Sequence, residues 1–206
     1  VCLIKLMVKI VMTLIPDGKK GVEDPGSPIY LDENIISQPA AALQLVAKEI
    51  FRMSDQVRDI LKKTIELVKN EEVKSIDGLK ENGEQVERLG KCITEYLAAL
   101  FSSGSLTEQQ AAQTASLMCV LSDVERMGTL SVEMAECMLE RSDRKYKYTP
   151  EAMDELQKSL KVLNKMFCDS LKALQGDDGI EPGKMMKRKD KLLDLDIKMR
   201  KAHIER

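Results

Sequence analysis

Apolar residues recur at alternating steps of three and four along several long segments, and this spacing limits what the chain can fold into. Such steps place apolar side chains on one face of an α-helix. Helices are expected over about residues 40–69, 73–101 and 106–140, then from Thr149 to Gly176 and from about Lys184 onward. No segment alternates with period two over six residues. The sequence therefore predicts an all-α protein built from long helices.

Composition and charge exclude several functions. Hydrophobic residues make up 43% of the chain, charged residues 32% and aromatic residues only 3%, which is typical of helical bundles. The net charge of −2 gives no basic surface for nucleic acid, so no nucleic-acid partner is expected. The five cysteines lack CxxC spacing and are expected to be free thiols. With one histidine, His203, and no glycine-rich phosphate loop, nothing indicates an enzyme.

The helix 106–140 carries two apolar seams, so we expect it to be buried more widely than a surface helix. One seam is Leu117, Val120, Val124, Met127, Met134 and Met138, and the other is Met118, Leu121, Glu125, Gly128, Val132, Ala135 and Leu139. Glu125 thus takes a position that suits an apolar side chain. A buried carboxylate without a partner is costly, so Glu125 needs a cation, a metal or a proton. An Arg or Lys of a neighbouring helix is the simplest partner, and metal is the alternative.

Local signals indicate helix ends and close contacts. Ser105 and Glu108 have the spacing of a capping box ahead of the helix 106–140. Thr149 followed by Pro150 is typical of a helix start. Gly83 and Gly90 fall in the apolar seam of the helix 73–101, where glycine costs up to about 1 kcal/mol relative to alanine. We expect them to allow close helix approach, and room for something bound is the alternative.

The N-terminal part differs from the rest. Residues 1–16 are apolar except for Lys5, Lys9 and Thr13, but are too short and too charged to span a bilayer alone. They suit a membrane surface or the end of a spanning helix that begins upstream; the alternative is a buried helix. Residues 17–39 are rich in Gly and Pro and predict a poorly packed linker, with the segment 29–31 docking onto the bundle. Both chain ends suggest a fragment of a longer protein.

The order of the helices suggests two units. Three long helices are followed by a turn and two more, which indicates a first three-helix bundle over residues 40–145 and a partial second bundle over 146–206.

Short motifs carry a family resemblance. The string SDVERMG, with Asp123, Glu125, Arg126 and Gly128, resembles the DLERIGD signature of PhoU-type domains, which are tandem three-helix bundles that regulate phosphate uptake. The strings VERLGKCITEYL and DKLLDLDIKMRKAHIER resemble further family patterns. Residues 30–33 and 39–43 are similar to the PhoU-like cytoplasmic tail of bacterial sodium/phosphate cotransporter family proteins.

The resemblance implies a function. The chain would be a regulatory module, not an enzyme, on the cytoplasmic side of the inner membrane, beside the transmembrane part of its own sodium-dependent phosphate transporter. Phosphate and sodium would then be partners only through the transporter, and a homo-oligomer is a further expectation. The alternative is a helical scaffold or oligomerisation module without metal. A di-metal oxidase bundle would need Glu-x-x-His pairs, which one histidine cannot supply.

The resemblance also implies candidate metal ligands, because PhoU-type domains bind metal clusters through E(D)xxxD motifs. Acids at i and i+4 share a helix face, and carboxylate oxygens suit hard cations. The motif positions fall on Gly83 and Glu87, on Glu125 and Thr129, and on Asp190 and Asp194. The candidate ligands for divalent or ferric ions are therefore Glu84, Glu87, Glu125, Asp190 and Asp194. The competing interpretation is solvated charge at Glu87 and surface salt bridges at the two aspartates.

Overall fold

The computed structural model describes residues 24–69, 73–145, 147–174 and 182–205. Within these ranges the chain forms a short 3-10 helix and five α-helices, and no strand. They are η1 (Glu33–Ile35), α2 (Pro39–Lys69), α3 (Asp77–Ser102), α4 (Glu108–Asp143), α5 (Pro150–Leu174) and α6 (Pro182–Glu205). The prediction of an all-α fold is confirmed.

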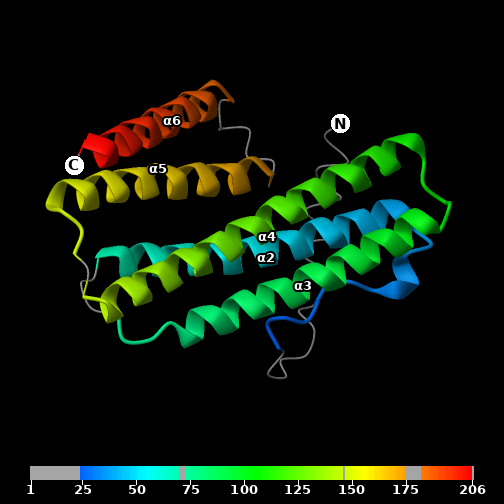
Figure 1. Cartoon of the computed structure of the whole chain (residues 1–206). Helices are drawn as coiled ribbons and strands as arrows, with labels where there is room; N and C mark the ends of the chain where they lie inside the picture. The colour runs from blue at the N-terminus through cyan, green and yellow to red at the C-terminus, as the bar shows by residue number, and fades with distance from the viewer. Residues whose placement is uncertain (1–23, 70–72, 146, 175–181, 206) are drawn as a thin grey trace.

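Helices α2, α3 and α4 form a three-helix bundle in which each helix packs against the other two (Figure 1). The residues of α2 at alternating steps of three and four are buried as far as Thr64, and the next one, Leu67, is half-buried. The buried ones are Leu43, Val46, Ile50, Met53, Val57, Ile60 and Thr64. Helix α4 buries parts of both its seams, and it packs against both α2 and α3. Each fully buried Leu, Ile or Val contributes about 1.5–3 kcal/mol, so these seams supply most of the stability of the bundle.

Two seam glycines bring helices into close contact, which was expected for Gly83 and not for Gly128. A Cβ atom added to Gly83 of α3 would lie 2.9 Å from Val132 Cγ2 of α4. A Cβ added to Gly128 of α4 would lie 3.3 Å from Val57 Cγ2 of α2. Side chains of neighbouring helices therefore fill the space that larger residues would need at both positions.

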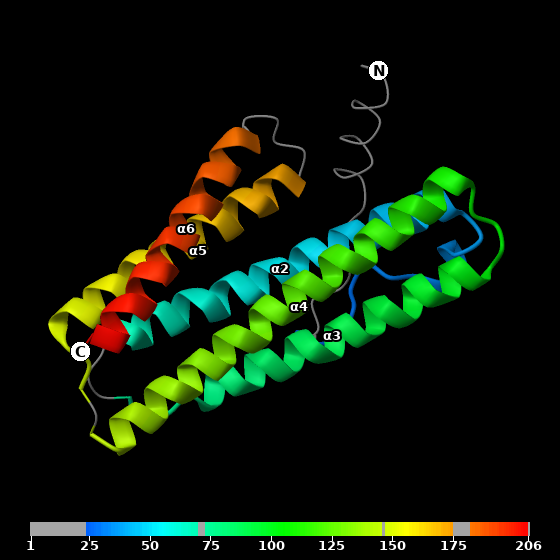
Figure 2. The same cartoon turned by 45° about the horizontal axis from the view of Figure 1, so that its top comes forward.

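Helices α5 and α6 pack beside this bundle (Figure 2). Helix α5 contacts both α2 and α6, and thus lies between them. An ion pair joins Asp169 of α5 to Arg188 of α6. One apolar row of α6 is half-buried on the side that faces α5: Leu192, Leu195, Met199 and Ala202. The opposite side of α6 exposes a second apolar row of Met186, Leu193, Ile197 and Ile204.

One predicted helix cap is wrong, and one is confirmed. The capping box of α4 is formed by Thr107 and Gln110 instead of Ser105 and Glu108: Thr107 Oγ1 accepts from the Gln110 backbone N–H, and Gln110 Oε1 accepts from the Thr107 N–H. Helix α3 begins at Asp77, four residues after the predicted start. At α5, Thr149 Oγ1 accepts from the Ala152 N–H, as expected for a helix start.

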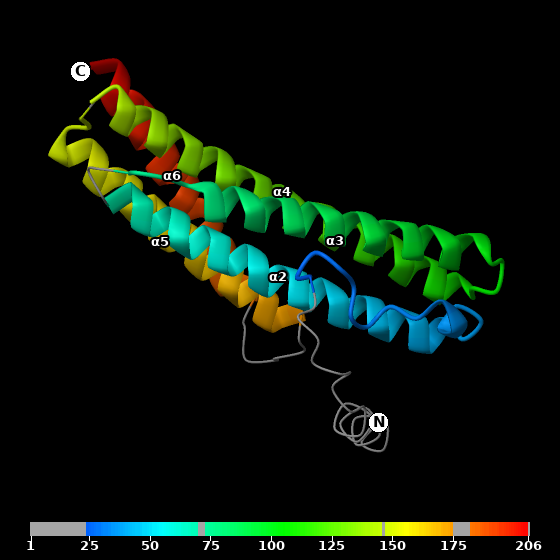
Figure 3. The ribbon, with the colours of Figure 1, turned by 90° about the horizontal axis from the view of Figure 1, so that it is seen from below.

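Residues 24–38, which we call the strap, lie along α2 and α3 (Figure 3). The expectation of a poorly packed linker is wrong for this segment, because side chains of both helices bind its backbone. The expected docking of residues 29–31 is confirmed by hydrogen bonds from two of their backbone amides to Glu49. Residues 1–16, for which we expected a membrane-proximal segment, lie outside the described residues. No helix in the described part of the chain is long and apolar enough to cross a membrane.

An acidic groove between two helices

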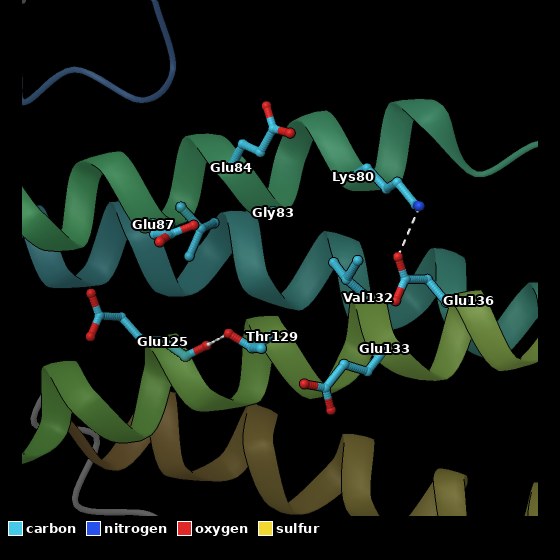
Figure 4. Close-up of a pocket in the computed structure, with 10 residues that line it drawn as sticks. Lys80, Gly83, Glu84, Glu87, Glu125, Thr129, Val132, Glu133 and Glu136 are labelled. Atoms are coloured by element: carbon cyan, nitrogen blue, oxygen red, sulfur yellow. Dashed lines mark hydrogen bonds and ion pairs between the residues drawn. The ribbon is translucent and has the colours of Figure 1, made fainter.

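A groove of about 570 Å³ runs between α3 and α4 (Figure 4). Most of the side chains that line it are acidic or small. The lining residues are Lys80, Gly83, Glu84, Val86 and Glu87 of α3, and Glu125, Thr129, Val132, Glu133 and Glu136 of α4. All four positions of the first two E(D)xxxD motifs therefore meet here, although only Glu87 and Glu125 among them are acids.

Glu125 lies directly over Gly90 of α3. A Cβ atom added to Gly90 would lie 1.8 Å from Glu125 Oε1 and 2.7 Å from Glu125 Cδ, which is far inside van der Waals contact. The glycine thus leaves room for the carboxylate of the neighbouring helix. This contact between α3 and α4 agrees with the expected close approach of helices at Gly90.

Glu125 has no cationic partner among the described residues, so the expected pairing with a neighbouring Arg or Lys is wrong. The side chain is half-buried instead of fully buried, which leaves it in contact with water. Burial raises the pKa of the Glu125 carboxyl above its ordinary value, and the negative charge of Glu87 raises this pKa further. Both effects shift Glu125 toward its protonated form relative to a carboxyl in water.

Three other polar side chains of the groove, those of Thr129, Lys80 and Glu136, have partners within the protein. Thr129 Oγ1 donates to the backbone oxygen of Glu125 at 3.2 Å, so this hydroxyl bonds within its own helix. At the far end of the groove, Lys80 Nζ lies 2.9 Å from Glu136 Oε1. Both of these side chains are about half exposed, so the pair contributes little to stability.

The remaining predicted residues are dispersed. Glu84 lies at the edge of the groove with its carboxylate pointing away from α4, whereas Glu87 points toward α4 (Figure 4). Asp190 and Asp194 are exposed on α6, which packs on α5, and Asp194 forms an ion pair of 2.6 Å with Lys198. This agrees with the surface salt bridge considered for Asp194.

The other motif residues do not contribute functional groups to the groove. Asp123 and Arg126 are exposed on α4. Gly128 is buried against Val57 and Val86, so its role is packing.

The groove does not fit a metal cluster. In the described ranges, no three Asp, Glu, Cys or His side chains gather in a way that could hold a metal ion. Gly83 and Thr129 stand where the partner acids of Glu87 and Glu125 would be, so each motif supplies one carboxylate. Ca²⁺ takes six to eight oxygen ligands, so two carboxylates would leave most of its coordination sphere to water.

Three charged residues of the groove were not predicted as site residues: Lys80, Glu133 and Glu136. Their spacing could have revealed them, because Glu133 and Glu136 follow Glu125 by eight and eleven residues and therefore share its helix face. Lys80 precedes Glu87 by seven residues on the facing helix.

A comparison with known protein families found a match, and it lies on the three-helix bundle. Residues 50–138 match the family model described as the PhoU domain. The match runs from the middle of α2 to the last turns of α4 and so covers most of the three-helix bundle. Comparisons with curated proteins and with solved structures give no match. The PhoU domain match indicates a regulatory role in phosphate homeostasis.

Proposed function

We propose that this chain is the cytoplasmic regulatory part of a sodium-dependent phosphate transporter at the inner membrane, and that it modulates phosphate transport through contacts of its helical bundle. The observation that carries the proposal is the PhoU domain match on α2, α3 and α4. The apolar residues 1–16 supply the second support, because their sequence suits the end of a membrane part. The partner of the bundle is then the transmembrane part of the same protein, and the chain itself catalyses no reaction.

Regulation in this proposal requires no metal cluster. In the acidic groove, Glu87 of α3 and Glu125 of α4 face each other. A cationic side chain of a partner could neutralise these two carboxylates as well as a metal ion could. The bundle would act by docking, with its long helices presenting fixed surfaces to the transporter.

The direct test is phosphate flux. Cells that produce the whole transporter are compared with cells that produce it without residues 40–206, under phosphate-rich and phosphate-poor growth, with uptake of labelled phosphate measured in sodium and in sodium-free medium. We expect the deletion to change sodium-dependent uptake in at least one growth condition. Unaltered uptake in both conditions, at equal transporter abundance, would contradict the proposal.

The coding sequence upstream of Val1 offers a second test. Several hydrophobic spans there would support the transporter, and a soluble domain in that place would refute it.

One observation favours the alternative of a self-associating scaffold, which is the exposed apolar row of α6. Met186, Leu193, Ile197 and Ile204 are 55%, 51%, 64% and 84% exposed and share one helix face. If the chain is such a scaffold, its mass by light scattering will be that of a dimer or larger, and Leu193→Lys with Ile197→Lys will reduce it to a monomer. A wild-type monomer would exclude the alternative.

A further inference from the structure

One buried carboxylate of α2, that of Glu49, binds the strap backbone. The side chain of Glu49 is fully buried, at 0% exposure. Its Oε2 accepts hydrogen bonds from the backbone N–H groups of Ile29 at 2.9 Å and Tyr30 at 2.7 Å. Its Oε1 accepts from Arg52 Nε at 2.5 Å. Glu49 therefore binds two successive donors of the strap backbone while its charge is balanced one turn along the same helix.

Arg52 binds the acceptors of the same strap. Its two terminal nitrogens donate to the backbone oxygens of Pro25 at 3.0 Å and Ser27 at 2.6 Å. A planar guanidinium presents such donors in a fixed fork, which the single ammonium of a lysine cannot reproduce. The pair of Glu49 and Arg52 thus holds the strap by its N–H and its C=O groups at once.

Helix α3 holds the strap from the other side. Arg88 lies 3.2 Å from Asp24, and Tyr96 Oη donates to the backbone oxygen of Asp32 at 2.8 Å. The buried Gly26 packs against the Arg88 guanidinium, where an added Cβ would lie 2.9 Å from Nη2. Because the strap is bound to both α2 and α3, all of these contacts can form together only when the two helices keep their relative position.

Little apolar surface supports these polar contacts. Gly26 is the only fully buried residue of the strap, Ile29 is 41% exposed, and Leu31, Ile35 and Ile36 are half-buried against the core. A segment with few buried apolar contacts opens at a lower free energy than the core it covers. The strap is accordingly able to separate while the bundle stays intact.

We propose that the strap is a latch, which opens and closes on α2 and α3 while the three-helix bundle stays folded, and that the Glu49–Arg52 pair is its lock. When the latch is closed, residues 24–38 are fixed to the face made by α2 and α3. When it is open, these residues move independently of the bundle. The latch does not depend on the proposed role in phosphate transport, and its test needs no phosphate.

Amide hydrogen exchange of the full 206-residue chain tests the latch. In the wild type, the amides of Ile29 and Tyr30 should exchange at least about tenfold faster than that of the buried Ile93 in α3. Arg52→Lys keeps a charge beside Glu49 but removes the fork, and it should speed exchange at Ile29 and Tyr30 a further tenfold or so while leaving Ile93 unchanged.

A matched control is available on the same helix. Arg58 pairs with Asp55 at 2.9 Å with the same i,i+3 spacing as Arg52 and Glu49, so Arg58→Lys should leave the strap amides unchanged. Equal effects of the two substitutions would overturn the assignment of the lock.

Two further results protect the test against a variant that fails to fold. Tyr96→Phe removes only the hydrogen bond to Asp32, and it should also speed exchange of the strap amides without affecting Ile93. In the wild type itself, exchange of Ile29 and Tyr30 at the rate of Ile93 would show that strap and bundle open together, which would overturn the latch.

Discussion

The carboxylate of Glu125 on α4 occupies the space that a side chain at Gly90 of α3 would fill, since an added Cβ would lie 1.8 Å from Glu125 Oε1. The two residues that break the apolar seams of their helices therefore compensate each other across the interface. The glycine admits the acid, and the acid stays half-buried and in contact with water instead of unpaired in the core.

This relationship predicts a coupling between Gly90 and Glu125. In an interior helix position, Gly→Ala stabilises by up to about 1 kcal/mol. In a Glu125→Ala background, we expect Gly90→Ala to increase the free energy of unfolding by most of that amount. In the wild type, the same substitution should increase it less or decrease it, because the Glu125 side chain must move away from the new Cβ. A double-mutant cycle measured by urea unfolding checks this. Equal effects of Gly90→Ala in both backgrounds would refute the coupling.

Glu125 should also make stability depend on pH. Its pKa is raised in the folded protein from the ordinary value of 4.5, so the folded state holds this proton more tightly than the unfolded state does. The free energy of unfolding should therefore fall as the pH rises from the ordinary pKa of 4.5 through the raised pKa of the folded protein. It should stay at the lower value at higher pH. The loss arises from burial first and from the charge of Glu87 second.

Glu125→Gln isolates this contribution, because the other titrating groups are shared with the wild type. Unfolding free energies from about pH 4 to about pH 8 should show the variant gaining stability relative to wild type as pH rises. Glu87→Gln should reduce the same difference by removing the repelling charge. A constant difference between wild type and Glu125→Gln across that range would exclude a raised pKa.

The groove geometry predicts weak metal binding. With one carboxylate from each motif and Thr129 bonded to its own helix, we expect purified protein to retain less than one equivalent of metal. Elemental analysis of wild type and of Glu125→Gln checks this, with Asp194→Asn on α6 as a control outside the groove. A stoichiometric metal that disappears only in Glu125→Gln would overturn the expectation.

The bundle could be predicted from sequence because its helices carry apolar residues at helical spacing on the faces that they bury. In α2, every seam position from Leu43 to Thr64 is buried, and periodicity alone indicates this. The site could be predicted only in part. Glu125 stood out in its own helix, but its position over Gly90 depends on the register of α4 against α3, which no local pattern specifies.

The role of Glu49 could not be inferred from local sequence. Glu49 lies beside the apolar seam of α2, where an acid is expected to be exposed. It is buried because it binds the strap, which precedes it by about twenty residues. Residues that owe their environment to a distant segment give no periodic signal. For the same reason, the sequence of the strap predicts a poorly packed linker. The groups that bind the strap are side chains of α2 and α3, which its own composition does not reveal.

The cap of α4 supplies a last prediction. Ser105 with Glu108 and Thr107 with Gln110 have the same spacing, and the turn at Gly104, whose φ is +67°, leads the chain into the helix so that Thr107 takes the cap position. Thr107→Ala should cost about 1 kcal/mol of unfolding free energy, because it leaves the Gln110 backbone N–H without its partner. Ser105→Ala should cost clearly less, since Ser105 bonds only to the nearby Ser103 hydroxyl. Chemical unfolding of both variants decides between the two boxes, and a larger loss for Ser105→Ala would assign the cap to the residue that the sequence first suggested.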